Sequence, residues 1–254
     1  MTEAHDDGVK KTVFSLKMLL SVLTAFVILM CPLILENPWS QMKRLDVLYW
    51  ITLPMATSGF TPFVCVFPVI PHGLQFVDEY NSGYIKSLLP RAGRRNYIKN
   101  KLVSSALSGG CVTALAFALV FLICAIGGCA TSADSLSEFY AGTVWKPYAL
   151  IWGGKLVLLM KLTLAFAHGM VWGLAALLVS CIYVNRYAAL MIPFVVYQIA
   201  WHLFQGKAYN PVYLLRGDWA GYSFWFEPLL IQAAVVVGLS LIIVICMRRK
   251  INEI

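Results

Sequence analysis

Long uncharged runs of apolar residues alternate with short polar segments along this chain. A helix needs about 20 apolar residues to cross a bilayer, and six runs reach or approach this length. They cover residues 18–35, 47–77, 102–133, 162–185, 187–206 and 228–247. The pattern predicts an all-α polytopic membrane protein, a single domain over residues 1–254 with six transmembrane helices. The polar segment 1–17 would precede the first helix.

Segment 78–101, between the second and third runs, is the most basic part of the chain. It carries six of the 20 Lys and Arg residues. Because Lys and Arg near the ends of spans resist translocation, we expect this segment on the cytoplasmic side. Six spans then place both termini in the cytoplasm and segments 36–46, 129–147 and 207–227 outside. The segments on the cytoplasmic side would together carry 13 of the 20 basic residues, in agreement with this orientation.

A short amphipathic helix is predicted inside this basic segment. Gly83 precedes it, and Pro90 is expected to end it because proline removes a backbone hydrogen bond. Its apolar positions recur with helical spacing, which gathers them on one face. They are Tyr84, Ile85, Leu88 and Leu89. Such a helix, presented to the cytoplasm, needs a surface to pack against.

The composition excludes an ordinary soluble domain. Charged residues make up 13% of the chain and the mean hydropathy is +0.75, whereas soluble domains carry roughly 25% charged residues. The net charge of +8 gathers at the ends of the apolar runs instead of forming one continuous face, so we expect no nucleic-acid partner. The seven Cys residues are an odd number and most lie inside apolar runs, which argues against a disulfide framework or a metal cluster.

Candidate catalytic groups are scarce in the apolar runs. These runs contain His72, His168 and His202 but no Asp or Glu, and proton relays or metal sites within membranes need such partners. The sequence also lacks H-E-x-x-H, G-x-S-x-G and G-x-x-x-x-G-K-[ST]. We therefore expect no enzyme activity, no bound metal and no directly bound cofactor. For His168 we expect a hydrogen bond to a neighbouring helix.

Two runs have compositions that affect helix packing. The second run contains four prolines, which predicts a bent or broken helix because each removes a backbone hydrogen bond. They are Pro54, Pro62, Pro68 and Pro71. In the third run, residues 104–110 are mostly Ser, Gly and Ala, and such small residues permit close contact with another helix.

The segments before the fourth run and before the last run contain unusual polar or aromatic residues. Lys155 and Lys161 interrupt the apolar pattern just before the fourth run, so we expect an amphipathic approach over roughly residues 148–160, with both lysines reaching outward to water. The alternative places them at the outer mouth of a path for an anionic substrate. Segment 207–227 is rich in aromatic residues and is expected to lie in the interface or to dip back into the membrane.

Segment 78–101 resembles the loop between the second and third helices in permease subunits of type-2 ABC transporters, the ABC-2 family. That loop commonly shows an acidic residue, a glycine four positions later, a leucine pair, a proline or basic residue, an arginine, an aromatic or aliphatic residue and a closing lysine. The matching residues here are Glu79, Gly83, Leu88, Leu89, Pro90, Arg91, Arg94, Tyr97 and Lys101. The flanks are similar too, because a proline-containing run precedes the acid and a Ser- and Gly-rich run follows the lysine.

In that family the loop is a coupling helix that docks into a groove on a separate ABC ATPase. The resemblance implies the same partner here, with ATP and Mg²⁺ bound by the ATPase and not by this chain. The apolar face would anchor in the groove, with Glu79, Lys86 and Arg91 at its polar rim. The residues expected to take part in coupling are Glu79, Gly83, Tyr84, Ile85, Leu88, Leu89, Arg91 and Arg94. The alternative is a basic loop that only fixes the topology and contacts anionic lipid.

The resemblance further implies a small export or self-immunity permease in a bacterial cytoplasmic membrane. We expect two copies, or one copy with a related permease, around a path for an amphipathic or lipophilic substrate such as a peptide, an antibiotic or a lipid-like molecule. The residues expected to line this path are Pro54, Phe60, Pro62, Phe67, Tyr197 and Trp201. Two alternatives stay open. One is an ATP-independent secondary transporter or channel, a class that usually has ionisable groups at midplane, and the other is an immunity membrane protein that does not transport.

Overall fold

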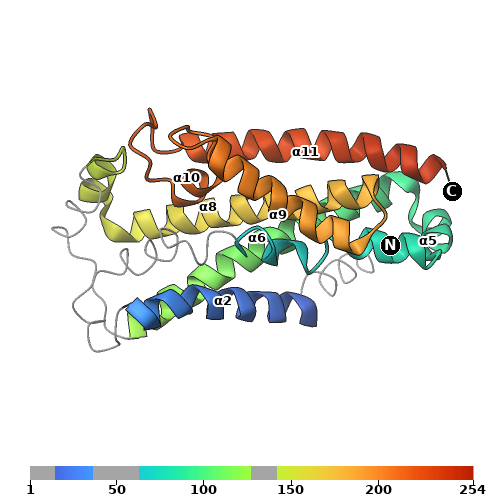
Figure 1. The fold of residues 1–254 in the computed structure, drawn as a ribbon, viewed down its shortest axis with the longest axis horizontal. Coiled ribbons are helices and arrows are strands. Elements are labelled where there is room, and N and C mark those ends of the chain that lie inside the picture. The colour runs from blue at the N-terminus through green and yellow to red at the C-terminus, as the bar shows by residue number, and fades with distance from the viewer. Residues whose placement is uncertain (1–14, 37–62, 127–141, 254) are drawn as a thin grey trace.

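Long helices lie side by side along the longest axis of the molecule (Figure 1). The computed structural model describes residues 15–36, 63–126 and 142–253. In chain order the elements are α2 (Leu16–Glu36), η3 (Phe67–Val69), α4 (Gln75–Asn81), α5 (Tyr84–Ala92), α6 (Arg94–Ile126), α8 (Lys146–Ile182), α9 (Arg186–Leu203), α10 (Pro211–Arg216) and α11 (Glu227–Asn252). No strand occurs in these ranges, so the predicted all-α class is confirmed for the described part of the chain.

Among the described residues, three helices contain a stretch that is long and apolar enough to cross a membrane. These stretches are Arg94–Ile123 in α6, Leu156–Ile182 in α8 and Glu227–Asn252 in α11. Helix α2 contains a shorter apolar stretch, Leu16–Cys31, and α9 has 18 residues. Helices α2 and α9 coincide with the first and fifth apolar runs of the sequence. The described helices are therefore compatible with a membrane protein.

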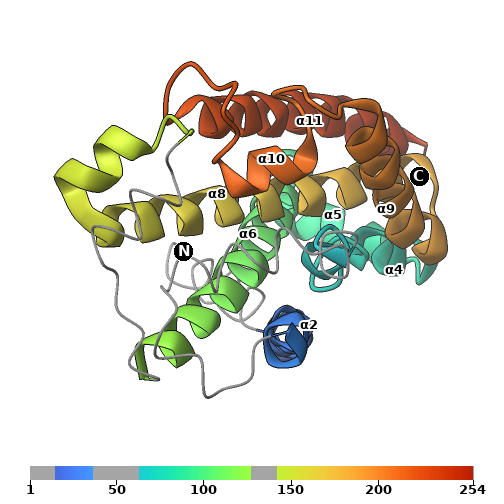
Figure 2. The same cartoon turned by 60° about the vertical axis from the view of Figure 1, so that its left-hand side comes forward.

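Helix α8 is continuous over 37 residues, from Lys146 to Ile182. The sequence predicted an amphipathic approach followed by a separate span, and the structure joins the two in one helix. Figure 2 shows the first turns of α8 as an arm that bends away from the rest. Gly153 and Gly154 lie in this part of the helix, and a glycine pair is a common site for such a bend.

The second apolar run is not a straight helix where the structure describes it. Residues 63–74 form turns and the short 3-10 helix η3 before α4 begins. Pro68 lies in η3 and Pro71 follows it, so both prolines interrupt α-helical bonding as predicted. The segment is nevertheless buried, because Val64 and Cys65 belong to the same hydrophobic cluster as residues of α2 and α6.

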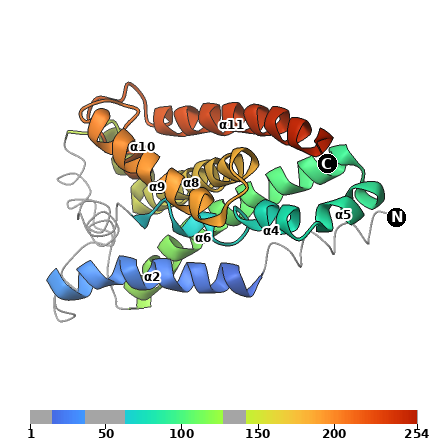
Figure 3. The same ribbon diagram turned by 45° about the vertical axis from the view of Figure 1, so that its right-hand side comes forward.

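The helices give the molecule two distinct ends (Figures 1 and 3). One end, which we call the α5 end, holds α4, α5 and the end of α11. The opposite end holds α10 and is called the α10 end. The predicted segments 1–17, 36–46 and 129–147 lie mainly outside the described residues, so their positions stay predictions.

Helices α6 and α8 contact each other through small residues. Ser105 Oγ of α6 donates a hydrogen bond to the Gly173 carbonyl of α8 at 2.8 Å. A Cβ atom added to Gly109 would lie 2.5 Å from the Gly169 carbonyl oxygen, and one added to Gly173 would lie 2.6 Å from the Ser105 carbonyl oxygen. Backbones this close leave no room for a side chain, so the predicted contact through residues 104–110 is confirmed.

Gly173→Val should force α6 and α8 apart and lower the melting temperature of the detergent-purified protein. Adding carbon atoms to a tightly packed contact lowers the free energy of unfolding by about 1–3 kcal/mol. The matched control is Gly238→Val in α11, where an added Cβ would meet nothing within 4 Å. Equal melting temperatures for the two variants would contradict the close α6–α8 contact.

Candidate functional site

Helix α5 is bounded by two glycines at one end of the molecule. Gly83, with φ 70°, turns the chain from α4 into α5, and Gly93, with φ 75°, ends α5; positive φ angles of this kind favour glycine. The prediction that Pro90 ends the helix is wrong, because α5 continues to Ala92. Proline is tolerated here because it removes only one bond in the last turn, and Lys86, whose carbonyl loses its partner, is exposed to solvent.

The apolar face of α5 packs mainly against its own chain. Ile85 is only 1% exposed and belongs to a buried cluster with residues of α4, α6 and α11. Leu88 and Leu89 are partly buried against the same cluster, whereas Tyr84 is 56% exposed. Ile85 therefore cannot reach a partner in this conformation. The exposed residues, which we call the α5 outer face, are Tyr84, Lys86, Ser87, Pro90 and Arg91.

A buried ion pair joins α4 to α6 next to α5. Glu79 Oε1 lies 2.6 Å from Lys101 Nζ, and Tyr97 OH donates a hydrogen bond to Glu79 Oε2 at 2.7 Å. The exposed fractions are 9% for Glu79, 8% for Lys101 and 3% for Tyr97. The prediction that Glu79 lies at a polar rim is therefore wrong, because this carboxylate faces inward. It positions α5 by tying the helices on either side of it together.

Two exposed contacts connect the α5 end to α9 and α11. Arg186, the first residue of α9, pairs with Asp78 of α4. Arg94, the first residue of α6, donates from Nη1 to Asn252 Oδ1 of α11 at 2.8 Å. Of the residues expected in coupling, the structure therefore leaves Arg91 on the outer face and engages Arg94 with the end of α11.

The described members of the predicted path lie together inside the bundle. Phe67 and Tyr197 belong to one hydrophobic cluster and Trp201 packs against it. Tyr197 is fully buried, and its ring centroid lies 5.2 Å from that of Trp172. In this conformation these residues fill the interior of one chain, so lining a path would require α9 to move. The other predicted path residues lie outside the described residues and are Pro54, Phe60 and Pro62.

His168 is buried in α8 beside the same cluster. Trp172 Nε1 donates a hydrogen bond to His168 Nε2 at 2.9 Å, one turn along the same helix. The Tyr197 ring of α9 stands edge-on to the imidazole, with centroids 6.3 Å apart. The predicted hydrogen bond from His168 to a neighbouring helix is therefore wrong: its partner lies on α8, and α9 supplies a ring contact.

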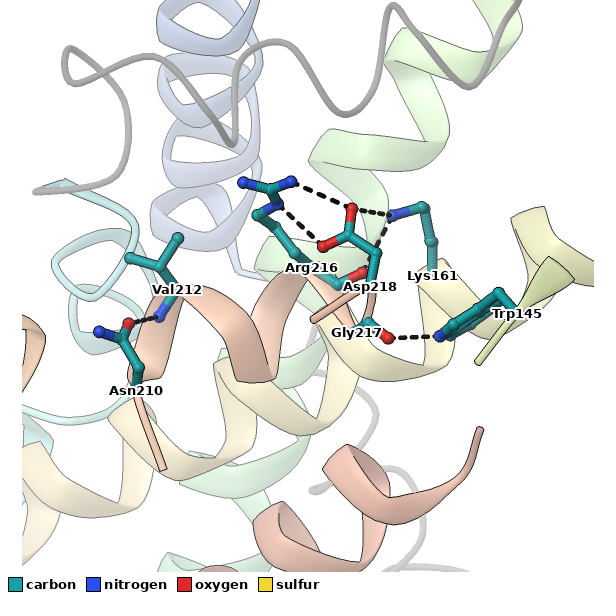
Figure 4. Close-up of polar contacts among 7 residues, drawn as sticks. All are labelled: Trp145, Lys161, Asn210, Val212, Arg216, Gly217 and Asp218. Atoms are coloured by element: carbon teal, nitrogen blue, oxygen red, sulfur yellow. Dashed lines mark hydrogen bonds and ion pairs between the residues drawn. The ribbon is translucent and has the colours of Figure 1, made fainter. Parts of the chain in front are cut away.

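Lys161 of α8 is buried against the segment that contains α10 (Figure 4). Its exposed fraction is 2%. Lys161 Nζ donates a hydrogen bond to the Arg216 carbonyl at 2.9 Å and lies 4.0 Å from Asp218 Oδ2. Asp218 also accepts hydrogen bonds from Arg216 Nε at 3.0 Å and from Nη2 at 3.3 Å. The prediction that Lys161 reaches outward is wrong because α10 folds back and supplies its partners; the side chain of Lys155 lies outside the described residues.

Helix α10 is a short helix with well-formed ends (Figure 4). Asn210 Oδ1 accepts a hydrogen bond from Val212 N at 2.9 Å at its start, and Gly217, with φ 71°, ends it. Trp145 Nε1 donates to the Gly217 carbonyl, and Gln232 Nε2 of α11 donates to a carbonyl of α10 at 2.6 Å. Part of segment 207–227 therefore packs into the bundle instead of lying loosely across its end.

Farther along this segment, Tyr222 OH donates to the Ala208 carbonyl at 3.2 Å. Burial, together with the carboxylates of Glu227 and Asp218, raises the pKa of the Tyr222 phenol. The phenol therefore stays a neutral hydrogen-bond donor that closes the segment on itself.

The ion cluster around Lys161 was not found from the sequence. Its two sides are 55 residues apart in the chain, and no local pattern links them. A signal for α10 itself was present, since Asn210 and Pro211 followed by Gly217 are typical of a short helix with a capped start and a glycine stop. Reading that signal would have predicted the helix but not its partner on α8.

Lys161→Met should lower the melting temperature and increase hydrogen exchange in α10. Removing one partner of a buried ion pair typically costs about 3–5 kcal/mol, although Arg216 continues to neutralise Asp218 and will reduce this loss. Lys146→Met, at the exposed start of the same helix, removes the same charge and is the control. If both variants exchange alike over residues 211–216, the cluster does not hold α10.

The Glu79–Lys101 pair should behave as a coupled unit in a double-mutant cycle. Glu79→Leu alone and Lys101→Met alone each leave a buried charge without its partner, and each should destabilise the protein by about 3–5 kcal/mol. The double variant should be more stable than either single variant, because no unpaired charge remains. If the double variant loses as much stability in melting experiments as the two single variants together, the two residues act independently.

Comparisons with known proteins give no family assignment. No protein-family model, no curated protein and no solved structure matches this chain. Among the described residues, no group of three or more His, Cys, Asp and Glu side chains could hold a metal ion. A function for this chain is therefore argued from its described helices, from the Glu79–Lys101 and Lys161–Asp218 ion pairs and from the exposed surface of α5.

Proposed function

We propose that this chain is the membrane-embedded permease subunit of an ATP-driven ABC-2 transporter, which exports an amphipathic or lipophilic substrate. The observation that carries the proposal is α5, a short helix held at one end of an apolar bundle with its outer face exposed. Its inner face and the buried Glu79–Lys101 pair fix it to the bundle. A helix that is firmly held on one side and free on the other is suited to transmit force from a partner.

The proposed topology has six spans with both termini in the cytoplasm. In it α2, α6, α8, α9 and α11 are the first, third, fourth, fifth and sixth spans, and residues 47–77 contain the second. Many basic residues belong to elements that meet at the α5 end, which supports a cytoplasmic location for that end. They are Lys86, Arg91, Arg94, Arg95, Arg186, Arg248, Arg249 and Lys250.

Force applied to α5 would reach three other helices through polar contacts of α4 and α6. The Glu79–Lys101 pair connects the α4–α5 unit to α6, Asp78 connects it to α9 through Arg186, and Arg94 connects the start of α6 to α11. Closure of an ATPase pair would displace α5 as a rigid element and tilt the helices attached to it. ATP and Mg²⁺ would be bound by the ATPase, and this chain would contribute no catalytic group.

Two permease copies, or one copy with a related permease, would enclose the substrate path. A pair is expected because two ATPase subunits act together and each needs a coupling helix; closed two-fold symmetry is the commonest arrangement of identical chains. Tyr197 and Trp201 of α9 would face the path after α9 moves. The aromatic and aliphatic surroundings of these residues suit an amphipathic or lipophilic substrate.

The buried Lys161–Asp218 pair favours a second candidate, an ion-coupled secondary transporter. Ionisable residues inside a membrane bundle often mark an ion or proton path. Here, however, Asp218 has two cationic partners and Lys161 also donates to a carbonyl. The cluster is therefore satisfied as it stands, which supports a structural role. ATP-independent uptake or efflux by the chain alone in proteoliposomes would favour this second candidate.

Tyr84→Asp should abolish co-purification of an ABC ATPase with the tagged chain from native membranes. Tyr84 is the large hydrophobic side chain of α5 that is exposed. A carboxylate pressed into an apolar groove costs several kcal/mol, which corresponds to at least a hundredfold weaker binding. Tyr187→Asp is the matched control, because Tyr187 is 80% exposed at the start of α9. The proposal is overturned if no ABC ATPase accompanies the wild-type chain, or if Tyr84→Asp retains it as well as Tyr187→Asp does.

A further inference from the structure

A basic hollow lies between the first turn of α6 and the last turns of α11. Its volume is about 260 Å³. The residues that line it are Arg94, Arg95, Ile98, Arg248, Ile251 and Asn252. It is thus built from two helices that meet only in the folded chain, and three of its six lining residues are arginines.

The lining combines positive charge with an apolar floor. Ile98 is 5% exposed and Ile251 is 2% exposed, so the floor is fixed by the core, while the side chains of Arg95 and Arg248 are exposed. Within residues 15–36, 63–126 and 142–253, no acidic residue lines the hollow. The carboxylate nearest in sequence, Glu253, lies 3.0 Å from Lys250 Nζ and 3.9 Å from Arg249 Nε, and both of these cations lie outside the lining.

This chemistry is suited to a phosphate group. Guanidinium groups bind phosphate through two parallel hydrogen bonds, which makes arginine the preferred residue for such contacts. The hollow also borders the start of α6, where the backbone N–H groups and the helix dipole favour a negative charge. Arg94 is held in place by its hydrogen bond to Asn252, so the site is partly organised before a ligand arrives.

The position of the hollow along the two helices indicates which phosphate-containing molecule can reach it. The uncharged runs of α6 and α11 begin at Leu102 and end at Met247, respectively. At a rise of about 1.5 Å per residue, Arg248 lies about 2 Å and Ile98 about 6 Å beyond these runs. The head-group layer is roughly 5–8 Å thick on each side of a bilayer, so the hollow would lie at the level of lipid head groups. A second hollow of about 400 Å³ shares Arg94 and Ile251 with the first, and Lys86, Leu89 and Pro90 of α5 complete its lining. The basic and apolar surface thus continues to α5, which provides room for a glycerol backbone beside the phosphate.

We propose that the hollow between α6 and α11 binds the phosphate group of an anionic phospholipid in the membrane leaflet at the α5 end. Basic pockets between spanning helices are suited to anionic head groups. The lipid would join α6 to α11 beside α5, so the stiffness of the α5 end would depend on the lipid composition. This inference goes beyond transport and requires only that α6 and α11 cross the membrane.

The test measures lipid binding to the full chain alone, without an ATPase. The chain is purified in detergent, phosphatidylglycerol or phosphatidylcholine is added, and bound lipid is counted by native mass spectrometry alongside the melting temperature. We expect one phosphatidylglycerol to be retained and to raise the melting temperature, with no such effect from phosphatidylcholine. Arg95→Gln/Arg248→Gln should weaken phosphatidylglycerol binding roughly 10- to 30-fold, since each basic group near an anionic head group contributes about fivefold.

A matched double variant separates the hollow from general charge. Lys99→Gln/Arg249→Gln removes the same two charges from exposed positions of the same two helices, and neither residue lines the hollow. This variant should bind phosphatidylglycerol like the wild type. An equal loss of phosphatidylglycerol binding in the two double variants would overturn the proposal, because binding would then reflect net charge alone. If Arg95→Gln/Arg248→Gln does not fold, Arg248→Gln is compared with Arg249→Gln, two neighbouring single changes.

Two further outcomes would assign the hollow to a different ligand. If millimolar inorganic phosphate raises the melting temperature as much as phosphatidylglycerol does, the hollow is a site for a free anion and the lipid proposal fails. If Arg95→Gln/Arg248→Gln retains the lipid but loses an ABC ATPase during purification, the hollow docks a protein and the proposal also fails. Failure of the ATPase test with Tyr84→Asp would leave the lipid measurement unaffected, because that measurement uses the chain alone.

Discussion

The close contact between α6 and α8 constrains where the other described elements can pack. Gly109, Gly169 and Gly173 bring the two backbones together because no side chain separates them. The same kind of contact recurs where Ser180 of α8 donates a hydrogen bond to the Gly73 carbonyl at 2.7 Å, which holds the turns before α4 against α8. Apolar side chains gain little by leaving lipid, so such close packing and hydrogen bonds are the main source of helix association in a membrane. Helices α2 and α11 then pack around this pair.

Buried charges occur in this bundle where a short element folds back onto a long helix. Glu79 and Lys101 fix the α4–α5 unit to α6 at one end, and Asp218 and Lys161 fix the α10 segment to α8 at the other. A buried charge without a partner is strongly destabilising, so each pair resists displacement of its element. Both ends of the molecule therefore carry a short helix whose position is set by electrostatics as well as by apolar packing.

The two faces of α5 have different environments, and this difference connects the fold to the proposed function. The inner face, with Ile85 at its centre, completes a cluster shared by α4, α6 and α11. Tyr84 and Arg91 remain exposed on the outer face. A partner that pressed on the outer face would therefore move α6 and α11 together with α5, because the inner face does not separate from them without exposing a core. The adjoining basic hollow lies at this junction, where a bound lipid would stiffen the same connection.

The sequence alone determined the helical class, most helix positions and the small-residue contact of α6. Apolar runs, glycine and proline positions and clusters of Ser and Gly are local features, so they predict local structure directly. The amphipathic spacing also identified α5 correctly as a helix with one apolar face. Nothing in that spacing tells which surface the face packs against, since a groove on a partner and a cluster in the same chain bury the same residues.

Tertiary structure decided that the partner of this face is the chain itself. It also decided that Lys161 is paired inside the bundle, because the carbonyl that accepts its hydrogen bond lies 55 residues away and comes close only when α10 folds back. The inward position of Glu79 depends in the same way on Lys101, which α6 brings beside α4. Local sequence limits what each segment can form, whereas the partners of charged and apolar side chains depend on which distant segments the packing brings together.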